Sequence, residues 1–214
     1  MIPSGNCKIG IGSVAIAPDD AIVVIDELRA SSTVVTACGL GVTEIEPLRD
    51  DDRAFYLQQN GVVIAGESGC LKIEGYDIGN SPVELAAFVS DHPFSKLALK
   101  TTNLVPLLLR IPHAIICSSL NLQAVAQRIR GRTVSIIAAG GTHGAAEDCA
   151  VALGLAALLN GTEFPADAVL SCVRESAAAR FLCSQGFGDD VAFIARLNLF
   201  DVVPYFDGRV IIPT

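Results

Sequence analysis

Residues 21–41, which read AIVVIDELRASSTVVTACGLG, constrain the fold more than any other stretch of the chain. The segment begins with five apolar residues rich in β-branched side chains, Ala21 to Ile25, a pattern typical of a strand covered on both faces in a parallel α/β sheet. The strand should end at Asp26. Apolar positions from Val34 to Cys38 then indicate a helix that ends at one of the two glycines that follow. A buried strand that leads directly into a helix predicts an α/β protein.

Polar residues fill the turn between this strand and this helix. In open α/β sheets ligands bind at the carboxyl edge, and a helix N-terminus offers unpaired N–H groups and a partial positive charge to an anion. Asp26 could hold a divalent metal, act as a nucleophile or cap the helix. Arg29 has a planar fork that suits phosphate, although it could also be a solvated surface residue. The hydroxyl groups that follow could cap the helix or donate to phosphate oxygens, and they belong to Ser31, Ser32 and Thr33.

Size, composition and charge limit the partners of the chain. The 214 residues are enough for a substantial core, and 51% of them are hydrophobic whereas 18% are charged. No stretch reaches the roughly 18 consecutive apolar residues of a membrane span, and the first twenty residues lack the features of a signal peptide, so we expect a cytoplasmic protein. The net charge of −8 argues against nucleic acid as a partner. An anionic substrate would need a metal ion or helix N-termini, because lysines are few.

Further strands and helices alternate along the chain. We predict strands at 7–17, 42–47, 62–65, 97–100, 114–117 and 133–139, with an edge strand at 210–212. Helices are expected to begin at 50–52, at Ser81-Pro82, at Leu122, near Ala145, at 165–167 and at 189–190. Residues 66–82 hold four glycines and read as a long loop, which in compact domains is often functional. Residues from Thr162 onward read as scaffold, and the seven cysteines as small buried side chains.

Three later strands also end in small polar residues. The strand at 97–100 runs into Thr101, Thr102 and Asn103, the strand at 114–117 into Ser118, Ser119 and Asn121, and the strand at 133–139 into Gly140, Gly141, Thr142, His143 and Gly144. If the strands are parallel neighbours, these ends converge with the turn after Ile25 on one edge of the sheet. Glu147 and Asp148 follow in the first turn of the next helix, where the helix dipole favours acidic residues by roughly 0.3–1 kcal/mol. At most one of the two should face a shared ligand, since adjacent helical side chains point in different directions.

The segments VIDELRASSTVVTACGLG, GYDIGNSPVE, KTTN, SSLNLQAVA and AAGGTHGAAEDCAVALG resemble, in order and spacing, those of the 2-phosphosulfolactate phosphatase family. NLFDVVPYFDGRVI also looks like the end of that family. The resemblance implies a three-layer α/β/α fold with a largely parallel or mixed central sheet. It also implies a magnesium-dependent phosphatase that hydrolyses phosphate esters of 2-hydroxy acids, and the family's named reaction gives sulfolactate in coenzyme M biosynthesis. We predict one domain over residues 1–214, which could consist of two closely packed subdomains.

The residues and the resemblance together give a hypothesis for the site. Mg²⁺ would be held by Asp26 and one of the two acidic residues after the glycine loop, while Arg29, hydroxyl groups and amides would hold the phosphate ester. The expected catalytic residues are Asp26, Arg29 and Asn80. The expected substrate-binding residues are Ser31, Ser32, Thr33, Ser81, Thr101, Thr102, Asn103, Asn121, Gly140 and Gly141, and the expected metal ligands are Asp26, Glu147 and Asp148. The alternative is a non-catalytic sensor of phosphate esters or other anions on the same scaffold, and a homo-oligomer is compatible with either.

Overall fold

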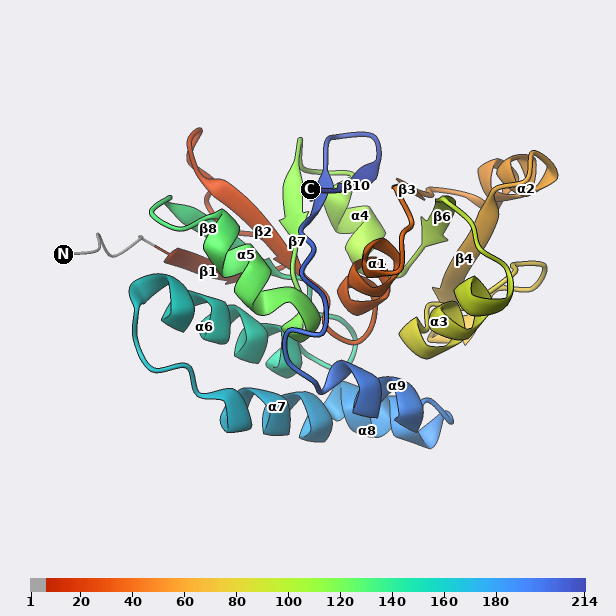
Figure 1. The fold of residues 1–214 in the computed structure, drawn as a ribbon. Helices are drawn as coiled ribbons and strands as arrows, with labels where there is room; N and C mark the ends of the chain where they lie inside the picture. The colour runs from red at the N-terminus through yellow and green to blue at the C-terminus, as the bar shows by residue number, and fades with distance from the viewer. Residues whose placement is uncertain (1–6) are drawn as a thin grey trace.

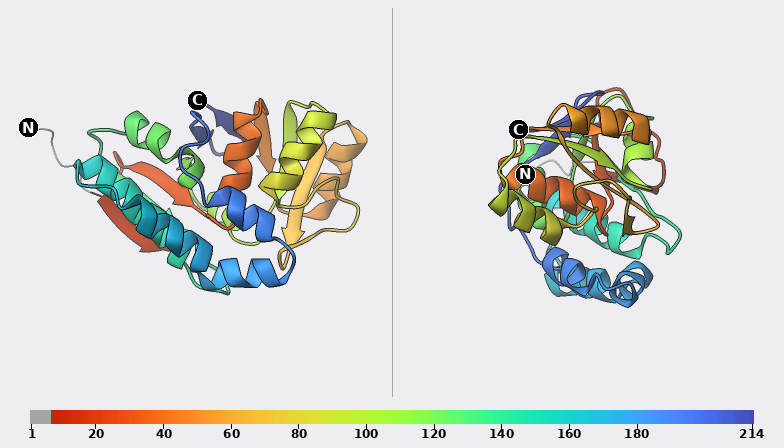
Figure 2. Two further views of the ribbon diagram at one scale, coloured as in Figure 1. Left: turned by 60° about the horizontal axis from the view of Figure 1, so that its bottom comes forward. Right: turned by 90° about the vertical axis from the view of Figure 1, so that its right-hand side faces the viewer.

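A computed structural model describes residues 7–214 of the chain. Over this range a mixed sheet of ten strands carries helices on both faces (Figures 1 and 2), which confirms the predicted three-layer α/β fold. The strands are β1 (Cys7–Ile11), β2 (Ala21–Ile25), β3 (Glu44–Pro47), β4 (Val63–Ser68), β5 (Leu71–Lys72), β6 (Lys96–Lys100), β7 (Ala114–Ile116), β8 (Val134–Ala138), β9 (Pro204–Phe206) and β10 (Ile211–Pro213). The helices are α1 (Ala30–Gly39), α2 (Asp51–Gln59), α3 (Pro82–Asp91), α4 (Leu104–Leu108), α5 (Leu122–Arg128), α6 (Ala146–Asn160), α7 (Ala166–Glu175), α8 (Ala177–Ser184) and α9 (Gly188–Ile194).

The sheet consists of two parallel groups joined by a short antiparallel section. Its order is β1-β8-β2-β7-β9-β10-β3-β6-β4-β5. The neighbours β1, β8, β2 and β7 are parallel, and so are β3, β6 and β4. Antiparallel pairings of β9 with β7, of β10 with β9 and of β10 with β3 connect the two groups. The carboxyl ends of each parallel group are therefore available to form a site.

Strand β2 lies inside the first group and is buried on both faces, as its apolar sequence predicts. Because side chains alternate along a strand, Ala21, Val23 and Ile25 pack in the cluster that holds α5, α6 and α7. Ile22 and Val24 point the other way, into the cluster that holds α1, α3 and α4. The central strand is thus fixed from both sides, and the turn that follows it has a rigid base.

The structure corrects several boundaries. The opening strand ends at Ile11, well before the predicted position 17. Part of the predicted loop 66–82 is regular structure, because β4 continues to Ser68 and pairs with the short strand β5. The helix expected to begin at 165–167 ends at Glu175 as α7 and is followed at once by α8, because Ser176 is extended and its hydroxyl accepts a hydrogen bond from the N–H of Ala179.

The strand predicted near residues 210–212 is present as β10, but it is not an edge strand. It lies between β9 and β3 near the middle of the sheet, and β9 itself was not predicted. Periodicity over three residues cannot show which neighbours a strand has. The two edges of the sheet in the described residues are β1 and β5.

None of the helices seen between residues 7 and 214 combines the length and apolar character that crossing a membrane requires. The prediction about a signal peptide rests partly on residues 1–6, which lie outside the described residues. The prediction of one domain stays a prediction.

Candidate active site

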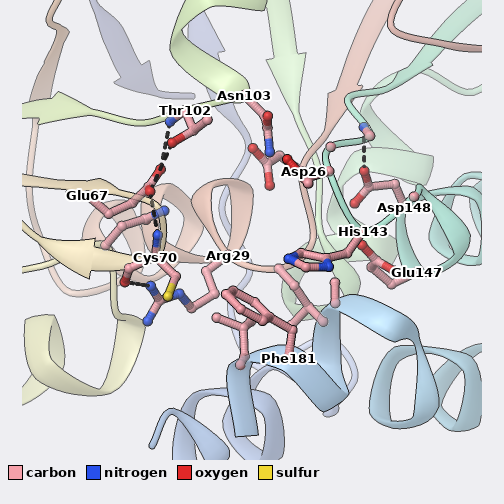
Figure 3. A pocket seen from close by; sticks show the side chains of 18 of the residues that line it. Asp26, Arg29, Glu67, Cys70, Thr102, Asn103, His143, Glu147, Asp148 and Phe181 are labelled. Carbon is pink, nitrogen blue, oxygen red and sulfur yellow. Dashed lines mark hydrogen bonds between the residues drawn. The ribbon is translucent and has the colours of Figure 1, made fainter. Parts of the chain in front are cut away.

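A pocket of about 280 Å³ opens where the carboxyl ends of the two parallel groups meet (Figure 3). The turns after β2 and β8 come from one group, and those after β4 and β6 come from the other. The start of α6 and the inner face of α8 complete the wall. The lining residues are Asp26, Leu28, Arg29, Glu67, Gly69, Cys70, Asn80, Thr102, Asn103, Gly140, Gly141, Thr142, His143, Gly144, Glu147, Asp148, Ala178, Phe181 and Leu182.

Carboxylates dominate one part of this wall. Asp26 is only 5% exposed, and its pKa is raised well above the usual value for aspartate, first by burial and then by the nearby charges of Asp148 and Glu67. Burial also raises the pKa of Asp148, to about 7, although backbone N–H groups oppose the shift. These shifts mean that the protein alone does not compensate the negative charge. The pocket is therefore suited to a cation or to protons.

Asp148 fastens two of the site-forming turns to each other. Its Oδ1 accepts a hydrogen bond of 2.7 Å from the N–H of Glu27, and its Oδ2 accepts one of 2.8 Å from the N–H of Gly140. The turn after β2 is thereby tied to the glycine loop after β8. Asp148 has a structural task in addition to any role towards a ligand.

Two oxygen atoms beside the pocket have no hydrogen-bond partner among the described residues. They are Oε2 of Glu147 and Oδ1 of Asn80, and both are buried. A buried polar atom without a partner costs free energy, so such atoms call for a bound ion, water or ligand. Glu147 therefore has an oxygen available to a ligand, whereas both carboxylate oxygens of Asp148 already accept hydrogen bonds.

The acidic residues could supply only some of the ligands of a metal ion. Within residues 7–214, no group of three or more His, Cys, Asp or Glu side chains is placed to hold a metal. Figure 3 shows Glu67 on the opposite side of the pocket from Glu147 and Asp148. Mg²⁺ is commonly bound by one or two carboxylates together with waters and substrate phosphate oxygens. Asp26, Glu147 and Asp148 fit this incomplete kind of site.

Glu67 is a pocket residue that the sequence reasoning missed. Its Oε1 accepts a hydrogen bond of 2.6 Å from the N–H of Thr102, and its Oε2 accepts bonds of 3.0 Å from the N–H of Cys70 and from the hydroxyl of Thr102. Glu67 therefore joins the end of β4 to the end of β6. The signal was present, because Glu67 follows the apolar residues of a predicted strand just as Asp26 does.

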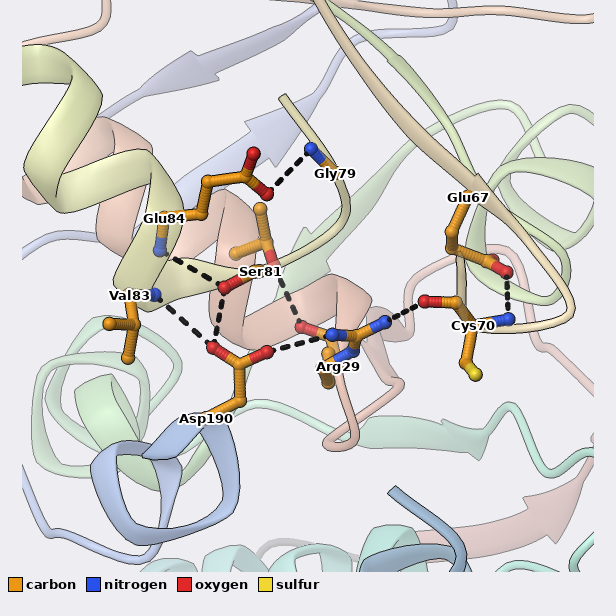
Figure 4. Close-up of polar contacts among 9 residues, drawn as sticks. Arg29, Glu67, Cys70, Gly79, Ser81, Val83, Glu84 and Asp190 are labelled. Atoms are coloured by element: carbon orange, nitrogen blue, oxygen red, sulfur yellow. Dashed lines mark hydrogen bonds and ion pairs between the residues drawn. The ribbon is translucent and has the colours of Figure 1, made fainter. Parts of the chain in front are cut away.

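Arg29 is not a solvated surface residue. Its Nη1 donates a hydrogen bond of 2.7 Å to Oδ2 of Asp190, and its Nη2 donates one of 2.6 Å to the carbonyl oxygen of Cys70 (Figure 4). The guanidinium carbon lies 4.1 Å from the ring centroid of Phe187. The side chain is buried at the wall of the pocket, where its charge is compensated and its orientation is fixed.

Helix α8 supplies an apolar part of the wall, so the interpretation of residues after 162 as scaffold is incomplete. Phe181 stacks on His143 with ring centroids 4.1 Å apart, and Leu182 also lines the pocket. This contact holds the glycine loop against α8 (Figure 3). The helical pattern of the sequence gave no sign of it, because pocket and core residues are alike in polarity here.

The glycines of the loop after β8 are needed for space as well as for backbone conformation. A Cβ atom on Gly141 would lie 2.8 Å from Nδ2 of Asn103, so the loop packs closely against the turn after β6. Gly140 has a φ of 68°, in the left-handed region that glycine adopts most easily. The two turns therefore meet at Gly141 and Asn103.

The predicted hydroxyl groups of α1 do not line the pocket. The hydroxyl of Ser31 accepts a hydrogen bond from the N–H of Asp26, and those of Ser32 and Thr33 donate to the carbonyl oxygens of Glu27 and Arg29. All three side chains are fully buried. They shape the turn that carries Asp26 and Arg29.

Three further predicted residues also lie outside the pocket lining. Ser81 caps α3 by accepting from the N–H of Glu84, and the hydroxyl of Thr101 accepts from the N–H of Val105. Asn121 is buried and bonds to the backbone around β7 and to residue 202. Of the four strand ends expected to converge, that of β7 is absent from the pocket and that of β4 takes part instead. The predicted residues brought together are Asp26, Arg29, Asn80, Thr102, Asn103, Gly140, Gly141, Glu147 and Asp148.

The fold and the pocket define a three-layer α/β protein with an acidic site at the carboxyl ends of its parallel strands. The family model described as 2-phosphosulpholactate phosphatase matches residues 13–209. The chain belongs to this family of phosphoric monoester hydrolases, as the resemblance in the sequence predicted.

Relatives from three organisms match most of the chain. A protein of Thermotoga petrophila named probable 2-phosphosulfolactate phosphatase is 32% identical over 200 residues, which are 85% of this chain and 87% of that protein. A protein of the same name from Carboxydothermus hydrogenoformans is 31% identical over 221 residues, covering 92% and 91% of the two chains. The 2-phosphosulfolactate phosphatase of Methanothermobacter thermautotrophicus is 30% identical over 204 residues, or 88% of each chain.

Proposed function

We propose that the protein hydrolyses the phosphate ester of a small 2-hydroxy acid with the help of Mg²⁺, and that this substrate is 2-phosphosulfolactate, which gives sulfolactate and phosphate. The names of its relatives support the substrate. The observation that carries the proposal is the meeting of buried carboxylates and a fixed arginine in one small pocket. Its volume of about 280 Å³ is near the lower end for ligand pockets, which suits a small substrate.

The acidic residues have a use in this reaction that they lack in a binding protein for anions. Asp26 and Glu147 would hold Mg²⁺, and Asp148 would keep their two turns together through its bonds to Glu27 and Gly140. When bound, Mg²⁺ would neutralise charge on the phosphoryl oxygens. Such neutralisation matters because phosphate monoesters are among the slowest of all substrates to react in water.

Arg29 and the surrounding polar groups would hold the ester. A guanidinium has five N–H donors, and two of those of Arg29 are bonded to Asp190 and Cys70 in the described residues. The others are free to donate to a phosphoryl or carboxylate oxygen of the substrate. Asn80 and Asn103 would orient the ester from the opposite turns, and amides of the glycine loop would contact its anionic groups.

Phosphate release from 2-phosphosulfolactate tests the proposal directly. We expect turnover with Mg²⁺, loss of turnover in excess EDTA and recovery when Mg²⁺ is returned. Full turnover in EDTA would refute the metal requirement. Tight binding of phosphorylated hydroxy acids without release of phosphate would favour the alternative function as an anion sensor. A place in coenzyme M biosynthesis, a cytoplasmic location, an absence of nucleic-acid binding and a homo-oligomeric state remain predictions.

A further inference from the structure

The strongest unassigned feature near the pocket is the contact between Arg29 and Asp190. The residues are 161 positions apart in the chain, and Asp190 comes from α9, outside the segments that carry the predicted site. Their side chains are each 2% exposed, and Nη1 of Arg29 lies 2.7 Å from Oδ2 of Asp190. A buried charge needs a partner of opposite sign with good geometry, and each residue supplies this to the other.

Asp190 is itself held on its other side. Its Oδ1 accepts a hydrogen bond of 2.6 Å from the hydroxyl of Ser81 and a longer contact of 3.4 Å from the N–H of Val83 (Figure 4). Both groups belong to the beginning of α3, which packs against α9. The carboxylate therefore cannot rotate without losing bonds on one side or the other.

The contacts of Arg29 determine the plane of its guanidinium. Asp190 binds one terminal nitrogen, the carbonyl of Cys70 binds the other, and the ring of Phe187 covers one face at 4.1 Å. Two of these three contacts, Phe187 and Asp190, come from a single short stretch at the start of α9. A planar fork held at both tips and on one face presents its remaining N–H groups in one direction.

We propose that Asp190 is the positioning residue that orients Arg29 towards the anionic group of the substrate. The inference rests on the proposed phosphatase function. Asp190 acts through Arg29 and does not itself line the pocket. Helix α9 is thereby a part of the reaction machinery, and the carboxylate keeps the guanidinium in place when the pocket is empty.

The test is the variant Asp190→Asn. The amide oxygen can still accept from Ser81 and Val83, but the amide nitrogen then faces Nη1 of Arg29, so that a donor meets a donor. We expect kcat/KM to fall on the order of 10²-fold, the scale of an error of about 1 Å in the position of a binding group. The hydrolysis of 2-phosphosulfolactate with Mg²⁺ is the assay.

A double-mutant cycle separates positioning from a merely structural role. Arg29→Met removes the fork, so adding Asp190→Asn to it should change kcat/KM less than about threefold if Asp190 acts only through Arg29. The second substitution should also restore thermal stability, because it neutralises the carboxylate left unpaired by the first. A 10²-fold effect of Asp190→Asn in both backgrounds would overturn the inference.

A matched control is Asp20→Asn. Asp20 is another buried aspartate, which accepts hydrogen bonds from Lys8, Ser135 and the N–H of Ala17, and it is not among the residues that line the pocket. We expect it to lower the melting temperature while kcat/KM per folded molecule stays at the parental value. The control shows how much of any loss follows from removing a buried carboxylate as such.

Two outcomes separate the inference from the proposed function. Failure of the parent enzyme to release phosphate would overturn the function and the inference with it. Turnover by the parent and a parental kcat/KM for folded Asp190→Asn would overturn the inference alone. If Asp190→Asn does not fold, Asp190→Glu keeps the charge next to Arg29 but moves the carboxylate by one methylene group. It should lower kcat/KM about 10-fold in the parent and not in Arg29→Met. A parental kcat/KM for Asp190→Glu would then overturn the inference.

Discussion

Replacing Asp26 by Asn should lower the activity of the enzyme while its stability stays the same or rises. The Asp26 carboxyl group is almost entirely buried, and its pKa is raised by burial and by the charges of Asp148 and Glu67. It also accepts a hydrogen bond from the backbone N–H of Ala30. The oxygen of an Asn amide can keep this bond while the charge is removed. The variant therefore loses the ionic group and little else.

The expected magnitudes follow from these contacts. A metal that neutralises transition-state charge contributes several kcal/mol, and about 4 kcal/mol corresponds to a loss of about 10³-fold in kcat/KM for Asp26→Asn. In the absence of metal, the melting temperature should stay the same or rise, since the native protein no longer holds a carboxylate that its surroundings disfavour. Such a gain in stability at the expense of activity is common where a site is built from groups that repel one another.

Asp148→Asn is the matched control, because both carboxylate oxygens of Asp148 accept backbone N–H bonds. An amide can satisfy only one of the two, and the buried N–H left over costs about 1–3 kcal/mol. For a chain of this size, about 2 kcal/mol lowers the melting temperature by about 4–8 °C. Thermal unfolding in EDTA and phosphate release with Mg²⁺ measure the two quantities. A lower melting temperature for Asp26→Asn with parental activity per folded molecule would show that Asp26 is structural and would refute the reasoning.

Three other predictions concern the protonation of Asp148, the metal and the glycine loop. Without metal, the stability contributed by protonated Asp148 should be lost as the pH rises from about 4 through its folded pKa of about 7, because the folded state binds this proton more tightly than the unfolded chain does. Mg²⁺ at about 100 times its Kd should raise the melting temperature by about 5–10 °C. The rise should be larger at pH 8 than at pH 6, because protons compete with the metal for the same oxygens. An equal shift at both pH values in a thermal scan would contradict this. Gly141→Ala should lower kcat/KM on the order of 10-fold with little loss of stability, because its Cβ would displace the amide of Asn103; parental steady-state kinetics would refute it.

The order of strands and helices could largely be predicted from the sequence. Ala21–Ile25 is entirely apolar, and Ser81-Pro82 carries the local chemistry of a helix start, so these elements lie where expected. These sequence signals depend on a few neighbouring residues, so they do not require knowledge of how the rest of the chain folds. The edge of the sheet that carries the polar turns could be predicted for the same reason.

The composition of the pocket could be predicted only in part. Asp26, Asn103 and Glu147 line it, whereas Ser31 and Asn121 use their polar groups to bond the backbone nearby. A hydroxyl or amide after a strand is equally suited to both uses, and the choice depends on rotamers and on neighbours far away in the sequence. The roles of α8 and α9 at the site could not be predicted for a related reason, because only the folded chain brings residues 181 and 190 to the turn after β2.

The antiparallel section formed by β9 and β10 has a consequence for how the molecule is made. Among the described strands, these two are the last to be synthesised, and they are also the only ones whose hydrogen bonds connect the two parallel groups. A nascent chain that has not reached residue 213 can pair β1, β8, β2 and β7 on one side and β3, β6 and β4 on the other, but it has no continuous sheet. Contacts between such distant parts of a sequence form slowly. Activity should consequently emerge late in biosynthesis, and chains that end before β9 should be ready targets for chaperones and proteases.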